Sequence, residues 1–335
     1  MRLTLSSITL SALSLVGYVL AAYPNPGAFG YLSQPLICVL SNKKGKVTGS
    51  IDVHDPTICR DSAGKYFLFS TAPGIAVRTS TDRTNWSYVG TVWSKGQATW
   101  TDKYTSTTGG NGNLWAPDCT YKNGRFYLYY AASSFGSRNS AIFFATSTTG
   151  LPNSWTNQGL VLSATNYDGY NAIDPSLIID GNNWWLTFGS FWSGIKLVPL
   201  GSSTGKPSGS TIYSLAKRTA GGGAVEAPML IKNGNYYYLF TSWDKCCDGT
   251  SSTYNIRIGR STSITGPYVD ESGVALMSGG GTEILGSHGS IIGPGGQSVF
   301  KDTDGWVIDY HYYTSTGSLL GINLLNFASG WPVVD

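Results

Sequence analysis

One pattern repeats along the chain and constrains its fold more than any other feature. Each copy has a polar residue, a proline, an apolar run, a glycine-bearing turn and an aromatic run. The clear copies, starting at positions 54, 115, 173 and 226, are HDPTICRDSAGKYFLFST, WAPDCTYKNGRFYLYYAAS, IDPSLIIDGNNWWLTFGSF and EAPMLIKNGNYYYLFTSW. A looser fifth copy, GGQSVFKDTDGWVIDYHYY, starts at position 295. Self-similarity at a nearly constant spacing indicates a repeat architecture.

Each copy predicts a unit of four short strands. A third apolar run follows the aromatic run, as in AIFFATST or NIRIGRST, and most copies then add an edge that carries Trp or Tyr. The chain has 21 Tyr, 11 Trp and 43 Gly but only 12% charged residues, a composition typical of short strands joined by tight turns. Four-stranded units repeated around an axis make a β-propeller. We therefore predict an all-β, five-bladed β-propeller with four-stranded blades as one catalytic domain over residues 23–335. Helical periodicity is too weak for a barrel of alternating strands and helices.

The N-terminus predicts export. Arg2 precedes an apolar run that ends in the small residues Ala21 and Ala22, which is typical of a secretory signal peptide over residues 1–22. The alternative, a membrane anchor, is disfavoured because the run is short and interrupted by Ser and Gly. We expect a secreted, extracellular monomer with a glycosylation sequon at Asn85-Trp86-Ser87 and no membrane partner. A net charge of +3 gives no reason to expect a nucleic-acid partner.

The five cysteines leave at least one unpaired in an exported chain. They are Cys38, Cys59, Cys119, Cys246 and Cys247. Their spacing does not match a zinc site. The adjacent pair at 246 and 247 can bond to one another only as a strained ring. Cys59 and Cys119 are at least as well explained as small buried residues without a redox role.

Hairpin turns set the direction of the strands. KNGR at 122–125, DGNN at 180–183 and KNGN at 232–235 predict tight turns in which Gly or Asn adopts positive φ. The first strand then runs from the proline motif to the turn, and the second strand returns. Residues before the first strand and after the second must share one face of the disc. On this face we place Asp55, Trp115, Asp174 and Glu226 at strand starts, and 133–135, 189–192, 243–247 and 311–313 at strand ends.

Three of the strand starts carry an acid. Asp55 and Asp174 stand one residue before their prolines, whereas Glu226 stands two before. Each Asp-Pro taken singly is explained by a turn. Three acids at equivalent places around one axis favour a reaction centre, because like charges in a partly dry cleft raise at least one pKa and so separate a proton donor from an acceptor. Glycoside hydrolysis needs such a pair, and a gap across a channel suits the wider, inverting separation.

The motifs HDP, LWAPD, NAIDPS, VEAP, SWDKCCDGTSSTYNIRIGRS and DYHYY resemble glycoside hydrolase family 43 from about His54 to the C-terminus. The DKCC run is closer to the endo-arabinanases of that family than to its xylosidases. The resemblance implies that Asp55 is the general base, that Glu226 is the general acid, and that Asp174 orients the acid and tunes its pKa. It also implies that His311 faces an ion, often calcium, held mostly by waters in the central cavity. No organic cofactor is expected.

Each of the other residues on this face can be interpreted either as a sugar-binding residue or as part of the protein's own packing and hydrogen bonding. Aromatic side chains serve as sugar platforms or as core, and the candidates are Trp115, Phe135, Phe191 and Trp192. Asn171 and Ser190 are candidates for hydrogen bonds to sugar hydroxyls. His311 competes as a buried hydrogen-bonding residue, and for His54 and His288 nothing beyond local hydrogen bonding is predicted.

The function predicted from these motifs is endo-hydrolysis of α-1,5-linked L-arabinan with inversion, with the polysaccharide as the partner. An exo-acting α-L-arabinofuranosidase or β-xylosidase on the same fold is the alternative within the chemistry, since loop shapes decide between a groove and a pocket. A non-catalytic sugar-binding propeller, which needs aromatics but no matched acids, and a protein-interaction propeller are the alternatives of another class.

Overall fold

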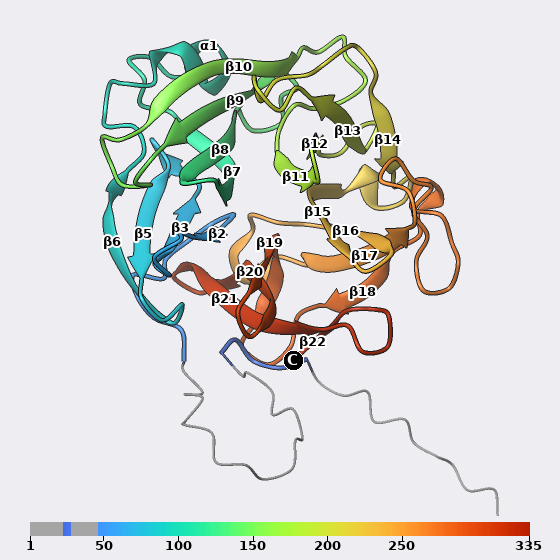
Figure 1. The fold of residues 1–335 in the computed structure, drawn as a ribbon. Coiled ribbons are helices and arrows are strands. Elements are labelled where there is room, and N and C mark those ends of the chain that lie inside the picture. The colour runs from blue at the N-terminus through green and yellow to red at the C-terminus, as the bar shows by residue number, and fades with distance from the viewer. Residues whose placement is uncertain (1–22, 28–45) are drawn as a thin grey trace, which may run out of the picture.

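The computed structural model describes residues 23–27 and 46–335 and confirms the five-bladed β-propeller (Figure 1). Five separate sheets follow one another in chain order around a central axis. The predicted signal peptide and Cys38 lie outside the described residues. Helices in the described part are single turns, namely η1 (Thr99–Thr101), α1 (Asp102–Thr105), η2 (Gly221–Gly223), η3 (Gly249–Ser251) and η4 (Leu276–Ser278). None of the helices over 23–27 and 46–335 has the length and apolar character needed to cross a membrane.

Blades three, four and five have the predicted four strands. Blade three consists of β11 (Ser176–Asp180), β12 (Asn183–Phe188), β13 (Ile195–Leu200) and β14 (Tyr213–Ala216). Blade four consists of β15 (Val225–Asn233), β16 (Tyr236–Trp243), β17 (Asn255–Ser261) and β18 (Thr282–Leu285). Blade five consists of β19 (Ile292–Asp302), β20 (Gly305–Thr314), β21 (Gly317–Asn326) and β22 (Val333–Val334).

Blades one and two have five strands, so the prediction of four is wrong there. Blade one consists of β1 (Thr48–Gly49), β2 (Thr57–Arg60), β3 (Tyr66–Ser70), β5 (Ala76–Ser80) and β6 (Asn85–Thr91). Blade two consists of β4 (Ala72–Pro73), β7 (Asn113–Lys122), β8 (Arg125–Ala132), β9 (Ser140–Ser147) and β10 (Thr156–Ala164). The extra strands β1 and β4 are two-residue pairings of connecting segments with the edge strands β6 and β7. Such short pairings leave no periodic signal in the sequence.

Each blade buries both of its faces against its neighbours. Side chains alternate along a strand, so in β3 Phe67 and Phe69 pack toward blade two whereas Leu68 packs toward blade five. The five hydrophobic clusters of the described residues each join two adjacent blades. A blade that is buried on both faces explains the continuous apolar runs of the repeat, such as AIFFATST.

The hairpin turns confirm the predicted strand directions. Asn123 and Gly124 have φ of 51° and 75°, and Gly181 has φ of 62°. In the third turn Asn233 still pairs with Tyr236, so this turn lies one residue later than predicted. The first strand of every blade therefore starts at the same face of the disc, where the proline motifs lie.

The ring is closed by contacts between the first and last blades. The segment before β2 pairs with β21, where Leu320 N donates to Ile51 O at 2.9 Å and Val53 N donates to Ser318 O at 3.2 Å. At the opposite face, the buried carboxylate of Asp302 in blade five pairs with Arg83 of blade one. The Tyr66 hydroxyl donates to the same carboxylate at 2.7 Å.

Two disulfides are present in the described residues. Cys59 and Cys119 are buried, as their interpretation as small buried residues requires, but they form a disulfide between the inner strands of blades one and two, so the interpretation that they have no redox role is wrong. The two cysteines lie 60 positions apart in the chain and come together only because the two blades pack side by side. Cys246 and Cys247 bond to one another in the loop after β16.

Candidate active site

A left-handed backbone residue lies just before, or in the first half of, the inner strand of every blade. The five residues and their φ angles are Asp55 (47°), Ala116 (41°), Asp174 (54°), Ala227 (49°) and Gly296 (58°). Four of them precede the repeated proline, and a non-glycine residue in this conformation costs on the order of 1–3 kcal/mol. All five line one small cavity of about 30 Å³ on the axis. The repeated motif thus encodes a bend at the mouth of the channel, and Glu226 lies one residue before the bend of blade four.

The three predicted acids meet at one cavity of about 800 Å³. Asp55, Asp174 and Glu226 all line it, although they are 52 to 171 positions apart in the chain. The predicted binding residues Trp115, Phe135, Asn171, Ser190 and Phe191 line the same cavity. Trp192 and the disulfide-bonded Cys246 and Cys247 also contribute to the wall. The propeller therefore places the predicted acids and the predicted binding residues around one cavity.

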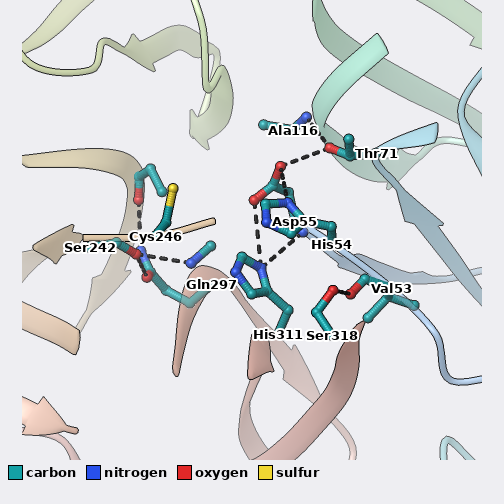
Figure 2. Close-up of polar contacts among 12 residues, drawn as sticks. Val53, His54, Asp55, Thr71, Ala116, Ser242, Cys246, Gln297, His311 and Ser318 are labelled. Atoms are coloured by element: carbon teal, nitrogen blue, oxygen red, sulfur yellow. Dashed lines mark hydrogen bonds and ion pairs between the residues drawn. The ribbon is translucent and has the colours of Figure 1, made fainter. Parts of the chain in front are cut away.

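Asp55 lies in a site that favours its ionised form (Figure 2). Its Oδ2 accepts a hydrogen bond from Thr71 Oγ1 at 2.7 Å and lies 3.0 Å from His54 Nδ1. Burial acts to raise the pKa of Asp55, but His54, His311 and the Thr71 hydroxyl outweigh burial and hold that pKa well below its usual range. A Cβ at Gly296 would lie 2.6 Å from Asp55 Oδ1, so only glycine leaves room for this oxygen.

The surroundings of Glu226 favour its protonated form. Ser190 Oγ donates to its Oε2 and Tyr254 Oη donates to its Oε1, each at 2.7 Å. Burial raises the pKa of Glu226 above its usual value, and the negative charge of Asp55 adds to this effect. The two hydroxyl donors and His54 act in the other direction but do not cancel burial. One cavity thus holds a carboxylate and a carboxyl group that keeps its proton to higher pH.

Asp174 connects to Glu226 through the backbone. Its Oδ2 accepts a hydrogen bond from the N–H of Ala227, the residue after Glu226, at 3.0 Å. Burial raises the pKa of Asp174 well above its usual value, and the charges of Glu226 and Asp55 raise it further. Two adjacent buried carboxyls do not both ionise readily. Asp174 therefore fixes the backbone beside Glu226, and the charge of an ionised Glu226 disfavours ionisation of Asp174.

The predicted binding residues differ in exposure and in the use of their polar atoms. Phe135 is 86% exposed at the rim of the cavity, and Trp192 is 40% exposed with the Arg138 guanidinium 5.3 Å from its ring. Asn171 is buried, and its Oδ1 accepts from Ser140 Oγ at 2.7 Å. The Ser190 hydroxyl donates to Glu226, so its proton is not available to a sugar while that bond holds.

His311 does not line the large cavity but lies fully buried beside Asp55. Its Nδ1 accepts a hydrogen bond from the Asp55 backbone N–H at 3.0 Å, and its Nε2 lies 3.0 Å from the Tyr313 hydroxyl. His54, Asp55 and His311 place candidate ligand atoms within 4.8 Å of one another. A neutral imidazole has one lone pair, which the Asp55 N–H occupies here. Direct ligation of an ion by His311 therefore does not fit this arrangement.

Sequence reasoning missed Thr71 and Tyr254, and it did not assign site roles to His54, predicted to make local hydrogen bonds, or to Tyr313, already placed on this face. Thr71 immediately follows β3, the second strand of blade one, so the rule that placed the other strand ends at this face also indicates Thr71. Tyr254 immediately precedes β17, which starts at the same face. His54 precedes Asp55 in the HDP motif, and Tyr313 lies in the DYHYY motif. Thr71, His54 and Tyr254 contact the acids directly, whereas Tyr313 contacts His54 and His311.

Comparison with known proteins agrees with this geometry. A family model described as "Glycosyl hydrolases family 43" matches residues 45–332. The "Extracellular endo-alpha-(1->5)-L-arabinanase 1" of Bacillus subtilis is 45% identical over 287 residues, which cover 84% of this chain and 87% of that protein. The solved "GH43 Endo-Arabinanase from Bacillus licheniformis" is 43% identical with a TM-score of 0.80, covering 86% of this chain and 99% of that one. An "Exo-1,5-alpha-L-arabinanase" from a bovine ruminal metagenomic library is 38% identical with a TM-score of 0.78, covering 85% and 97%.

Proposed function

This chain belongs to glycosyl hydrolases family 43 and is a glycoside hydrolase, and we propose that it is a secreted endo-hydrolase of α-1,5-linked L-arabinan that acts with inversion. One observation carries the proposal. Asp55 and Glu226 face the same cavity with pKa values displaced in opposite directions. A protonated donor opposite an ionised acceptor is the arrangement that glycosidic bond cleavage requires.

Glu226 is the proton donor in this mechanism. Its raised pKa keeps the carboxyl protonated, and Ser190 and Tyr254 hold its two oxygens in a fixed orientation. It donates that proton to the oxygen of the leaving sugar as the glycosidic bond breaks. Asp174 holds the backbone of Ala227 and so positions Glu226, and repulsion between the two carboxyls means that only one of them ionises readily.

Asp55 is the base, and its Oδ1 is the oxygen that takes the proton from water. Oδ2 already accepts from Thr71 and faces His54, whereas Oδ1 lies over the space left by Gly296. The water attacks the anomeric carbon on the face opposite the leaving group, so one displacement inverts the configuration. General acid and base catalysis of this kind contributes roughly 10²–10⁴-fold each.

The substrate class and the endo mode rest on the relatives and on the cavity. Proteins named as endo-arabinanases cover most of this chain, and the cavity carries exposed aromatic rings at its rim. Linear arabinan and branched arabinan would be digested and the early products separated by chromatography, with the anomeric signal followed by proton NMR. Mixed oligosaccharides with inverted reducing ends are expected. Arabinose alone from the outset contradicts endo action, and retained configuration contradicts the assignment of Asp55 as a base.

Two variants separate catalysis from binding. Glu226→Gln and Asp55→Asn keep the shape of the site but remove the donor and the acceptor. Each should lower kcat on linear arabinan by roughly 10²–10⁴-fold while the affinity for arabino-oligosaccharides, measured by calorimetry, stays close to the parent value. Hydrolysis at the parent rate by Glu226→Gln would contradict the assignment of Glu226 as the acid.

Export and glycosylation are further parts of the proposal. Asn85 is exposed on the outer strand β6, so its side chain is accessible to a glycan. A eukaryotic secretory host should release a protein that starts near residue 23 and loses mass on treatment with an N-glycosidase. A culture medium without the protein, or a form that retains residues 1–22, contradicts export by a cleaved signal.

An ion in the central cavity is proposed from the family resemblance alone. It would be held through waters, because His311 has no free lone pair while its contact with the Asp55 N–H holds. Added calcium should raise the melting temperature of chelator-treated protein. A melting temperature that calcium leaves unchanged contradicts this part of the proposal.

A further inference from the structure

We propose that Tyr313 is a positioning residue for Asp55, because its hydroxyl closes a ring of hydrogen bonds that starts at the Asp55 backbone and ends at the Asp55 carboxylate. The catalytic consequence rests on the proposed role of Asp55 as base, whereas the ring itself can be tested without substrate. Two of its members, Tyr313 and His311, lie outside the wall of the large cavity and are 4% and 0% exposed.

The links of the ring are short. The Asp55 N–H donates to His311 Nδ1 at 3.0 Å, and His311 Nε2 lies 3.0 Å from Tyr313 Oη. Tyr313 Oη lies 3.1 Å from His54 Nε2, and His54 Nδ1 lies 3.0 Å from Asp55 Oδ2. The rings of His54 and His311 stack with centroids 4.0 Å apart (Figure 2).

Counting donors and lone pairs fixes every proton in the ring. His311 Nδ1 accepts, so a neutral His311 carries its proton on Nε2 and donates it to Tyr313 Oη. The backbone N–H of Cys247 donates to the same oxygen at 2.9 Å. Both lone pairs of the phenol are then occupied. Its own proton has two acceptors within reach, His54 Nε2 at 3.1 Å and Cys247 Sγ at 3.9 Å, and the shorter contact assigns it to His54 Nε2. A neutral His54 then carries its proton on Nδ1, where it is donated to Asp55 Oδ2.

The local electrostatics agree with these protonation states for His311 and Tyr313. Burial lowers the pKa of His311 well below its usual value, and the nearby His54 lowers it further, so the imidazole of His311 is neutral. Burial raises the pKa of the Tyr313 hydroxyl, which keeps its proton as a donor. Burial acts to lower the pKa of His54, but Asp55 and then Glu226 outweigh burial and raise that pKa, so the neutral form of His54 is the one present at pH values above it.

The ring decides which oxygen of Asp55 reacts. The His54 Nδ1–H and the Thr71 hydroxyl together occupy Oδ2, so the carboxylate cannot rotate without losing two donors. Oδ1 then stays free for water. Tyr313 contributes by holding His54 in the tautomer and orientation that donate to Oδ2, and the Cys247 N–H holds Tyr313 in turn.

The first measurement is the protonation of the histidine rings by long-range proton–nitrogen NMR in mildly alkaline buffer. The chain has three histidines, and the variant His288→Gln removes the one outside the ring. The expected parent spectrum shows His54 protonated on Nδ1 and His311 protonated on Nε2. In Tyr313→Phe the His54 signals should move toward a mixture of tautomers. A parent His54 protonated on Nε2, or His54 signals that Tyr313→Phe leaves unchanged, would overturn the proposal whatever the enzyme hydrolyses.

The second measurement is the kinetics of the same variant on linear arabinan. Tyr313→Phe should lower kcat by roughly 10–100-fold, as expected for a misplaced catalytic group, and should leave KM within about twofold of the parent, because Tyr313 does not line the cavity. Tyr312→Phe removes a hydroxyl from the neighbouring tyrosine, which packs against the cluster between blades four and five, and should retain the parent kcat. A Tyr313→Phe protein with the parent melting temperature and the parent kcat contradicts the role of Tyr313.

Discussion

The hydroxyl of Tyr254 offers a sharp test of how the acid is tuned. It donates to Glu226 Oε1 at 2.7 Å in a site where Tyr254 itself is 3% exposed. This bond favours the ionised form of Glu226 and so lowers its pKa against the larger effect of burial. Tyr254→Phe removes the donor without changing the shape of the side chain. The pKa of Glu226 must therefore rise further in the variant.

The expected size of the effect follows from the energy of the bond. A hydrogen bond to a charged group contributes about 1.5–3 kcal/mol, and about 1.4 kcal/mol corresponds to one pH unit. Glu226 acts in its protonated form, so activity is lost as the pH rises through its pKa. The alkaline limb of the kcat/KM profile should therefore move to higher pH, by about one unit or more.

The assay is the pH dependence of kcat/KM on linear arabinan, which reports the free enzyme. Ser190→Ala removes the other hydroxyl donor and should move the alkaline limb in the same direction. Tyr312→Phe serves as the matched control and should leave the limb in place. An alkaline limb that stays fixed or moves to lower pH in Tyr254→Phe would refute the assignment of Tyr254 as the group that tunes the acid.

Three further predictions concern stability, covalent structure and binding. Asp302→Asn breaks the buried pair with Arg83 between blades one and five and should lower the free energy of unfolding by about 3–5 kcal/mol. The control Asp304→Asn changes a side chain that is 50% exposed and should lower the free energy of unfolding by less than about 1 kcal/mol. Equal denaturation midpoints for the two variants would contradict this difference. Alkylation of the unreduced, denatured protein followed by mass spectrometry should modify one cysteine, Cys38, and a second modified cysteine would contradict the two disulfides. Phe135→Ala should raise KM for arabinan by roughly 3–10-fold with kcat unchanged, given about 0.5–1.5 kcal/mol for an aromatic contact; an unchanged KM would exclude this ring as a sugar platform.

The repeat predicted the architecture because its signals are local. A proline, an apolar run and a hairpin turn lie within about twenty positions in every copy, and each unit must bury both faces against the next. Strand direction followed from the turns, and the face that carries Asp55, Asp174 and Glu226 followed from strand direction. The additional strands β1 and β4 were not predictable, because two-residue pairings depend on where connecting segments lie after the blades have packed.

The sequence by itself determined that three acids gather at the mouth of one channel, since that requires only the repeat and the turns. Only the tertiary structure decided how the two working acids differ, because a pKa depends on burial and on charges that reach a group through space. Thr71 and His311, from opposite ends of the chain, hold Asp55 toward its ionised form, while burial outweighs the donors around Glu226 and keeps its proton bound. The same reason applies to Cys59 and Cys119, whose bond exists because two blades lie side by side.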